Sequence, residues 1–194
     1  MKHKLLSILV SMSALAGSAR ATDVLFDFNS LNGLSRDSAI SEYMTGVYGS
    51  AVTTGGARAS NQRGDEPTGN SNFFIATSLQ LFSRGDFEIL FADVPILGAS
   101  FEGHVLDPTT GEDFSVTAFQ GDTVVFQYTR DAGVEIVDSG WLAFNSPVDR
   151  LVVSDNGRKD VGIDNLLVQP VPDPATALLL VVGAVATVRR RRSV

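Results

Sequence analysis

The sequence predicts an all-β domain, an antiparallel β-sandwich of jelly-roll type, between two targeting segments at the chain ends. Three observations favour this fold. Short apolar stretches alternate with a period of two residues, turn residues (Gly, Asp, Asn and Pro) separate these stretches at close spacing, and no long stretch has the helical period. A parallel α/β sheet would need long helices between its strands, and the sequence lacks them.

The alternation is clearest in Asp86-Phe87-Glu88-Ile89-Leu90-Phe91. Two segments depart from it: a short helical turn is expected at 38–43, and a long surface loop is expected over 53–72, which is rich in Gly, Asn, Thr and Ser. Residues 22–170 are therefore expected to form one exported β-sandwich domain. In chain order its predicted strands span 24–28, 73–77, 86–91, 99–105, 113–119, 123–129, 134–137, 141–144, 148–153 and 161–168.

Composition narrows what this domain does. All but one of the 22 acidic residues lie in 22–170, against 8 of the 15 lysines and arginines, so the region carries a net charge of −13. Such a charge repels nucleic acid, and no nucleic-acid partner is expected. The chain has no cysteine, which excludes a disulfide framework, a thiolate zinc site and a lipoprotein anchor. His104 is the sole histidine of the region, which excludes a histidine-built metal centre.

Residues 1–21 have the three parts of a secretory signal peptide. Lys2 and Lys4 supply the positive region, 5–16 the apolar region, and Ala19 and Ala21 the small-x-small cleavage pattern. The apolar region is too short to cross the ~30 Å hydrocarbon core of a membrane. We therefore expect export through the secretory translocon and cleavage by signal peptidase after Ala21.

Residues 171–194 form a second targeting segment. A Pro-Asp-Pro motif is followed by an apolar run over about 175–188, and then by four arginines. The run is ~21 Å long as a helix, marginal for a transmembrane span, and the arginines would stay on the cytoplasmic side. The residues of the motif and of the basic cluster are Pro172, Asp173, Pro174, Arg189, Arg190, Arg191 and Arg192.

In order, spacing and C-terminal position, this tail resembles the PEP-CTERM sorting signal. The family usually has Glu where this chain has Asp173, which keeps the charge and shortens the side chain. The resemblance implies processing by exosortase, an integral membrane protease, after a transient stay in the inner membrane. It also implies a final location at the cell surface or outside the cell. The alternative is a single-pass anchor that keeps the protein in the membrane.

Oxygen-bearing side chains near both ends of the domain form a candidate calcium site. Asp27 lies in the predicted first strand, Asn29 follows it and Asp164 lies in the last, and these two strands of a β-sandwich are expected side by side. Carboxylate and amide oxygens are the ligands that Ca²⁺ prefers. The arrangement is similar to the structural calcium site of carbohydrate-binding modules with a galactose-binding-like jelly roll, which implies a structural calcium ion. The alternative is that these side chains cap turns and face water.

Two further patterns bear on activity. Aromatic residues can stack on sugar rings, but Trp141 precedes Leu142-Ala143-Phe144, which favours packing within a strand. A glycosidase would need two carboxylates facing one cleft, and nothing in the sequence singles out a pair. His104 alternates with Glu102 and is interpreted as structural. Candidate acids for such a pair include Glu88, Glu102, Glu112 and Glu135.

Together these observations predict a non-catalytic cell-surface or extracellular-matrix protein that associates with exopolysaccharide. This role rests on fold class and on the location that the tail implies. Two alternatives stay open: a small secreted polysaccharide hydrolase, and a single-pass membrane-anchored surface protein.

Overall fold

A computed structural model describes residues 22–31, 36–60, 62–63, 66–67, 74–76, 86–105, 113–131, 136–154 and 161–172. Residues 23–170 form one compact unit, and all that follows concerns the described part of it. Within this part, no helix is both long and apolar enough to cross a membrane.

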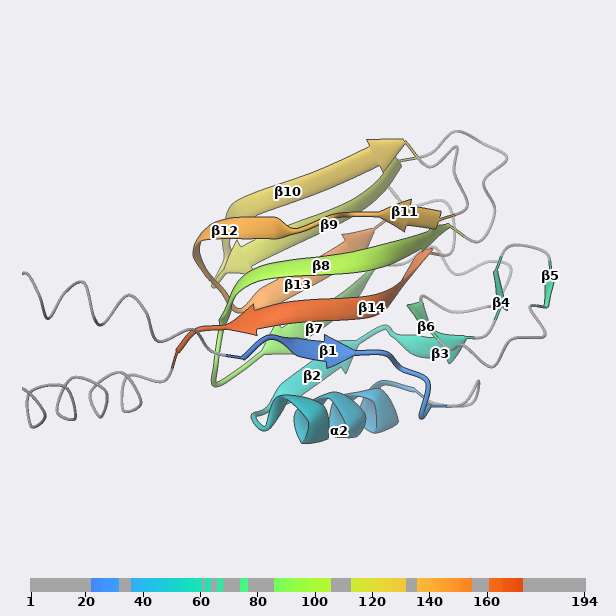
Figure 1. The fold of residues 1–194 in the computed structure, drawn as a ribbon, viewed down its shortest axis with the longest axis horizontal. Helices are drawn as coiled ribbons and strands as arrows, with labels where there is room; N and C mark the ends of the chain where they lie inside the picture. Colours follow the sequence, from blue (N-terminus) through green and yellow to red (C-terminus); the bar gives the residue numbers. More distant parts are fainter. Residues whose placement is uncertain are drawn as a thin grey trace, which may run out of the picture. The chain divides into compact units, whose positions relative to one another are not determined.

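The unit is built from two antiparallel β-sheets, which we name sheet A and sheet B; sheet A lies in front in Figure 1. The strand pair β4 (Gln62–Arg63) and β5 (Glu66–Pro67) stands apart from both. Sheet A contains β1 (Val24–Phe26), β3 (Arg58–Ser60), β6 (Phe74–Ala76), β8 (Ile96–Val105), β11 (Ile136–Asp138), β12 (Leu142–Val148) and β14 (Val161–Pro170). Sheet B contains β2 (Val52–Gly55), β7 (Phe87–Phe91), β9 (Asp113–Gln120), β10 (Thr123–Asp131) and β13 (Arg150–Ser154).

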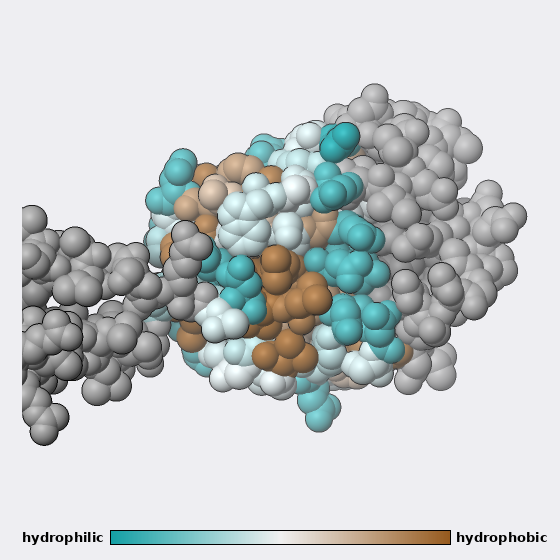
Figure 2. All heavy atoms as spheres, in the orientation of Figure 1, coloured by the Kyte–Doolittle hydropathy of each residue, from teal (hydrophilic) through white to brown (hydrophobic). Residues whose placement is uncertain are grey.

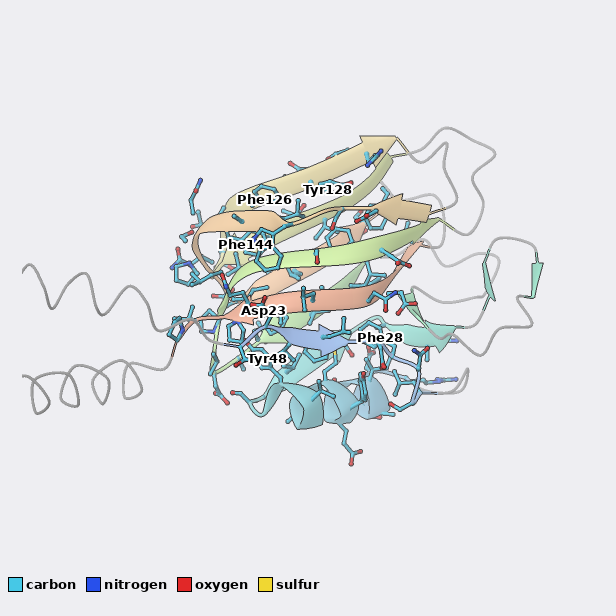
Figure 3. The ribbon with its side chains drawn as sticks, viewed as in Figure 1. Asp23, Phe28, Tyr48, Phe126, Tyr128 and Phe144 are labelled. Carbon is cyan, nitrogen blue, oxygen red and sulfur yellow. The ribbon has the colours of Figure 1, made fainter. Side chains whose placement is uncertain are left out.

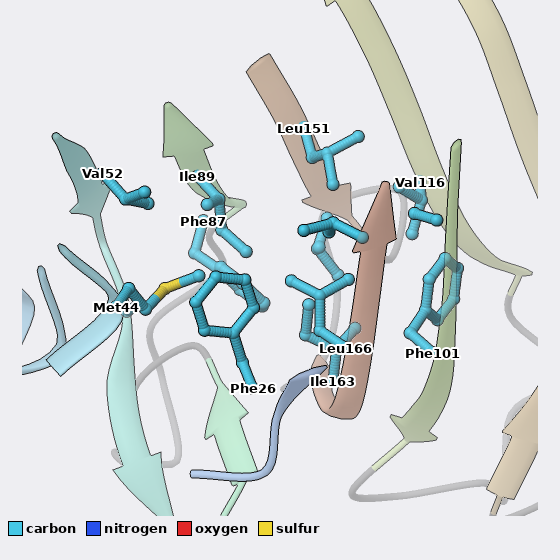
Figure 4. Close-up of a cluster of buried hydrophobic side chains, with 14 of the residues drawn as sticks. Phe26, Met44, Val52, Phe87, Ile89, Phe101, Val116, Leu151, Ile163 and Leu166 are labelled. Atoms are coloured by element: carbon cyan, nitrogen blue, oxygen red, sulfur yellow. The ribbon is translucent and has the colours of Figure 1, made fainter. Parts of the chain in front are cut away.

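The sheets pack face to face around one apolar core, part of which Figure 4 shows. In β7 the alternation is directly visible, because Phe87, Ile89 and Phe91 are buried while the residues between them are exposed. Rings meet across the layers: Phe101 of sheet A lies 5.7 Å from Tyr128 of sheet B, centroid to centroid. The predicted antiparallel β-sandwich is therefore confirmed, and its assignment to the jelly-roll type stays a prediction.

Helix α2 (Asp37–Tyr48) closes one side of the sandwich, beside β1 and β2 (Figure 1). Ile40 and Met44 are one turn apart and point into the core, where both are fully buried. The ring of Tyr48, labelled in Figure 3, reaches between the two layers and lies 5.3 Å from that of Phe91. The helix ends at Gly49, whose φ of 74° suits a residue without a Cβ.

All ten predicted strands exist, with shifted ends. The first is the clearest case: it was expected over 24–28 but ends at Phe26, because Phe28 has a φ of 53° and leaves the ladder. The prediction of a single helical turn at 38–43 is wrong, since α2 has 12 residues. Its sequence contains weak helix formers, and burial against the sandwich outweighs their propensity.

The prediction of a long surface loop over 53–72 is also wrong where the structure describes this segment. Strand β2 pairs with β7, and β3 pairs with β6, although neither shows apolar alternation in the sequence. Both strands are held from outside by hydrogen bonds that sequence patterns do not reveal. Asp37 of α2 accepts hydrogen bonds from the backbone N–H groups of Gly56 (3.1 Å) and Ala57 (2.8 Å), between the two strands.

We expect the protein to lose stability above about pH 10, the ordinary pKa of tyrosine. Burial raises the pKa of Tyr48, whose hydroxyl donates to the carbonyl oxygen of Val94 at 2.8 Å. The pKa of Tyr43 is also raised, mainly by burial and secondly by the hydrogen bond that its hydroxyl donates to Asp27. The unfolded chain therefore releases protons at a pH where the folded chain keeps them, so stability is present below about pH 10 and is lost above it.

This expectation is checked by measuring the melting temperature across the alkaline range for the native sequence and for Tyr48→Phe. The variant should melt somewhat lower at neutral pH, because the hydrogen bond to Val94 is gone, and should fall less steeply above about pH 10. An equally steep fall in both proteins would contradict the assignment to Tyr48.

Candidate functional site

The outer face of sheet A carries the candidate site. Side chains of directly opposite residues in paired strands point to the same side of a sheet. The pairing of β8 with β11, β12 and β14 therefore shows which residues share this face. We call it the Trp141 face. Its members from the described residues are Leu25 of β1; Asp164, Leu167 and Gln169 of β14; Gly98, Ser100 and Glu102 of β8; Asp138 of β11; and Trp141 and Ala143 at the start of β12.

Trp141 lies against this face, with its indole packed closely against Gly98. A Cβ atom placed on Gly98 would lie 2.5 Å from Cζ2 of the indole, so only glycine leaves room for the ring. Trp141 is nevertheless 47% exposed. Tryptophans are highly buried on average. Trp141 instead presents almost half of its surface to solvent.

A tight turn before Trp141 constrains the backbone that leads into this residue. Gly140 has a φ of 59°, a conformation that other residues rarely adopt, and its N–H donates to Oδ1 of Asp138 at 2.9 Å. Ser139 binds the turn to β8: its N–H donates to the carbonyl oxygen of Phe101 (3.0 Å), and its hydroxyl accepts from the N–H of Phe101 (2.9 Å). The direction in which Trp141 leaves the turn is thereby set by the neighbouring strand.

An apolar patch continues the face beside Trp141. Leu25 and Leu167 lie opposite each other on β1 and β14, and Leu25 is 51% exposed. Figure 2 shows this patch as the brown area near the middle of the face, with hydrophilic residues around it. At its border Nε2 of Gln169 donates to Oδ1 of Asp23 at 3.4 Å. Exposed apolar side chains that gather beside an aromatic ring and within a polar rim are typical of a binding surface.

Three carboxylates cross the same face in one row. Glu102 of β8 has Asp164 of β14 directly opposite on one side and Asp138 of β11 directly opposite on the other. Asp164 is only 3% exposed. Like charges directly opposite each other on a sheet disfavour folding, so the row is a cost that the rest of the domain offsets.

The strands that carry the predicted calcium ligands do lie side by side, as expected: β1 pairs antiparallel with β14. Oδ1 of Asp27, however, already accepts hydrogen bonds from the hydroxyl of Tyr43 (2.9 Å) and the N–H of Asn29 (3.2 Å). Asp164 lies at an irregularity of β14, where Asn165 has a φ of 48° and donates its N–H to Oδ1 of Asp164 at 2.7 Å.

Across the described residues, three or more His, Asp or Glu side chains nowhere form a group that could hold a metal ion. A structural calcium ion bound by Asp27, Asn29 and Asp164 stays a prediction.

Two of the acids considered for a hydrolase are described, and they do not share a cleft. Glu88 lies on the outer face of sheet B, where its Oε2 is 3.6 Å from Nη1 of Arg150. Glu102 lies on the outer face of sheet A, on the other side of the core. Glu112 and Glu135 lie outside the described residues.

The targeting residues cannot be placed. Ala19 and Ala21 lie outside the described residues, as does the sorting segment apart from Val171 and Pro172. The sorting residues that the structure does not describe are Asp173, Pro174, Arg189, Arg190, Arg191 and Arg192.

The interpretation of Trp141 as strand packing is wrong. The residue precedes β12 instead of belonging to it, and almost half of its surface is exposed. The one signal in the sequence is the Ser139-Gly140 pair before it, which is typical of a turn and not of a strand interior. The partner glycine, Gly98, is 43 positions away in the sequence, and no local pattern links the two.

Comparisons with known proteins give fold neighbours only. No family model matches the chain, and no curated protein matches it. Among solved structures, the chain is similar to a mutant family 29 carbohydrate-binding module complexed with mannohexaose, with 15% identity, a TM-score of 0.47, and coverage of 78% of this chain and 93% of that one. It is also similar to another mutant of that module complexed with cellulohexaose, with 15% identity, a TM-score of 0.46, and coverage of 78% and 93%. None of these chains is close enough to assign a function to this protein.

Proposed function

We propose that this protein is an exported, non-catalytic protein that binds polysaccharide on the Trp141 face. The observation that carries the proposal is the half-exposed Trp141, whose indole packs closely against Gly98. Sugar rings have one polar edge of hydroxyl groups and apolar faces of C–H groups. An open, rigid aromatic ring complements such a face, and it loses little conformational entropy on binding because it is already positioned.

The surroundings of the ring suit the rest of a sugar. Leu25 and Leu167 extend the apolar contact, while Ser100, Glu102 and Gln169 place polar groups on the same side of the sheet. The face is a broad sheet surface, which fits a polymer better than a small molecule, because small ligands prefer closed pockets.

Export and sorting belong to the same proposal. The signal peptide (residues 1–21) would direct the chain to the translocon and signal peptidase, and the PEP-CTERM-like tail (171–194) would hold it briefly in the inner membrane for exosortase. The mature domain, a jelly-roll-type sandwich with a structural calcium ion, would then reach the cell surface or the extracellular matrix, where exopolysaccharide is the ligand at hand.

The decisive experiment is affinity electrophoresis of the purified protein through gels that contain soluble polysaccharides. The native protein should be retarded by at least one of them. Trp141→Ala should lose most of this retardation, with an affinity lower by about tenfold or more, because the stacking surface is gone. Its melting temperature should change little, since the removed ring is half exposed.

Two further variants sharpen the test. Gly98→Ala keeps the indole but displaces it, so its binding should also weaken. Val124→Ala is the matched control: it removes a 54% exposed apolar side chain on β10 of sheet B, and retardation should not change. Retardation that survives in Trp141→Ala would contradict the proposal, and so would release of reducing sugar by the native protein.

A further inference from the structure

We infer that the Trp141 face selects neutral, hydroxyl-bearing polysaccharides and rejects those that carry carboxylate or sulfate groups. This inference rests on the proposed function and adds the class of ligand. It comes from Glu102 and Asp138, which lie directly opposite each other on this face and place two carboxylates on the surface that the polymer would cover, beside the buried Asp164.

The row lies within reach of a polymer stacked on Trp141. Gly98, under the indole, and Glu102 are four residues apart on β8, which is ~13 Å along a strand. Ser100 lies between them on the same side. An oligosaccharide that stacks on the indole and runs along β8 therefore reaches Glu102 and the neighbouring Asp138.

The orientation of the row is fixed by its hydrogen bonds. Asp138 is held by the N–H of Gly140, and Asp164 by the N–H of Asn165. Glu102 is half-buried between them. The negative charge therefore stays in place, whereas flexible acids could move away from an incoming anion.

In the described part of the sheet, basic residues lie away from Glu102 and Gly98. Among the described residues, none of the positions that the ladders place beside Glu102 or Gly98 is Lys or Arg. Arg130 of β10 lies at one end of the row and donates Nη1 to the backbone carbonyl oxygen of Asp138 at 3.3 Å. Arg58 lies on edge strand β3, beyond β6, and Arg150 belongs to sheet B.

The chemistry of the two ligand classes then differs sharply. Hydroxyl groups of a neutral sugar can donate to carboxylate oxygens, and hydrogen bonds to a charged acceptor are the stronger kind. A uronate or sulfated sugar at the same place brings a further negative charge against those of Glu102 and Asp138. Repulsion of this kind discriminates between ligands that are otherwise alike in shape.

The test uses pairs of polysaccharides that share a backbone and differ in charge. Suitable pairs are hydroxyethyl-cellulose and carboxymethyl-cellulose, dextran and dextran sulfate, and methyl-esterified and de-esterified homogalacturonan. Dissociation constants are measured by affinity electrophoresis with the full chain and with Trp141→Ala, Glu102→Gln and Glu42→Gln, at low and at high salt. Glu42 lies exposed on α2, so its variant removes one negative charge outside the Trp141 face.

The expected result is Trp141-dependent binding to the neutral member of a pair, and binding to its acidic partner that is weaker by about tenfold or more. Glu102→Gln should narrow this difference several-fold, Glu42→Gln should leave it unchanged, and high salt should narrow it for the native protein.

Three outcomes would overturn the inference while the proposed function stands: equal or tighter Trp141-dependent binding to the acidic member, acidic binding that appears only when calcium is added, or a preference for the neutral member that Glu102→Gln does not change. If no polysaccharide of the panel shows binding that depends on Trp141, the proposed function fails and the inference fails with it.

Discussion

Replacing Phe101 by alanine is expected to lower the free energy of unfolding by about 3–5 kcal/mol, because it removes the ring that joins the two sheets. Phe101 is 3% exposed, and its ring centroid lies 5.9 Å from that of Phe114 and 5.7 Å from that of Tyr128, both in sheet B. Gly103, two residues on, has no side chain that could fill the gap, and the ring of Phe114 already packs closely against it. The cavity would therefore remain open.

Urea unfolding followed by tryptophan fluorescence measures this loss, since Trp141 is the only tryptophan of the chain. The matched control is Leu90→Ala, which removes a side chain that is 36% exposed on the outer face of sheet B and should cost under about 1 kcal/mol. A loss for Phe101→Ala as small as that of the control would mean that the layers do not depend on this contact.

Replacing Asp37 by alanine is expected to destabilise the protein by about 3 kcal/mol. Its carboxylate accepts hydrogen bonds from the N–H groups of Gly56 and Ala57 and from the hydroxyl of Thr54 (3.2 Å), and so joins the first turn of α2 to β2 and the start of β3. Without it, the partly buried N–H of Ala57 loses its acceptor, which costs about 1–3 kcal/mol, and the exposed N–H of Gly56 exchanges its hydrogen bond for one to water at a smaller cost. Asp37 also lies in the first turn of the helix, where negative charge is favourable.

Two control variants accompany this measurement. Asp37→Asn keeps one acceptor oxygen and should lose only part of the stability. Asp93→Ala removes an aspartate whose one hydrogen bond to a side chain, from Ser50, is long at 3.4 Å, and should change the free energy of unfolding by under about 0.5 kcal/mol. Equal losses for Asp37→Ala and Asp93→Ala would show that α2 is held by its apolar face alone.

The apolar pattern of the sequence predicts most of the fold, and β7 shows why. Phe87, Ile89 and Phe91 alternate with polar or exposed positions, and burial of every second residue follows from strand geometry whatever the partner strands are. The pairing of the first and last strands was also predictable, as a general feature of β-sandwiches. Strands β2 and β3 could not be predicted from the sequence, because these short polar segments are held in place by Asp37 and by neighbouring strands.

The candidate site, too, could be predicted from the sequence only in part. Its residue types are visible in the sequence: one tryptophan, several acids and a turn of Ser139 and Gly140. Their common location is not visible, because Trp141 meets Gly98, and Glu102 meets Asp164 and Asp138, through sheet register alone. Register is set by the whole ladder, and a shift of one residue would turn each of these side chains to the other side of the sheet.

By itself, then, the sequence determined that this protein is an acidic, cysteine-free β-sandwich domain, because alternation, turn residues and composition are local properties of the chain. Only the tertiary structure decided that Trp141 lies open on a sheet face instead of inside the core. The physical reason is the missing Cβ of Gly98, which lets an indole from a distant turn pack against the strand while almost half of the residue's surface stays in solvent.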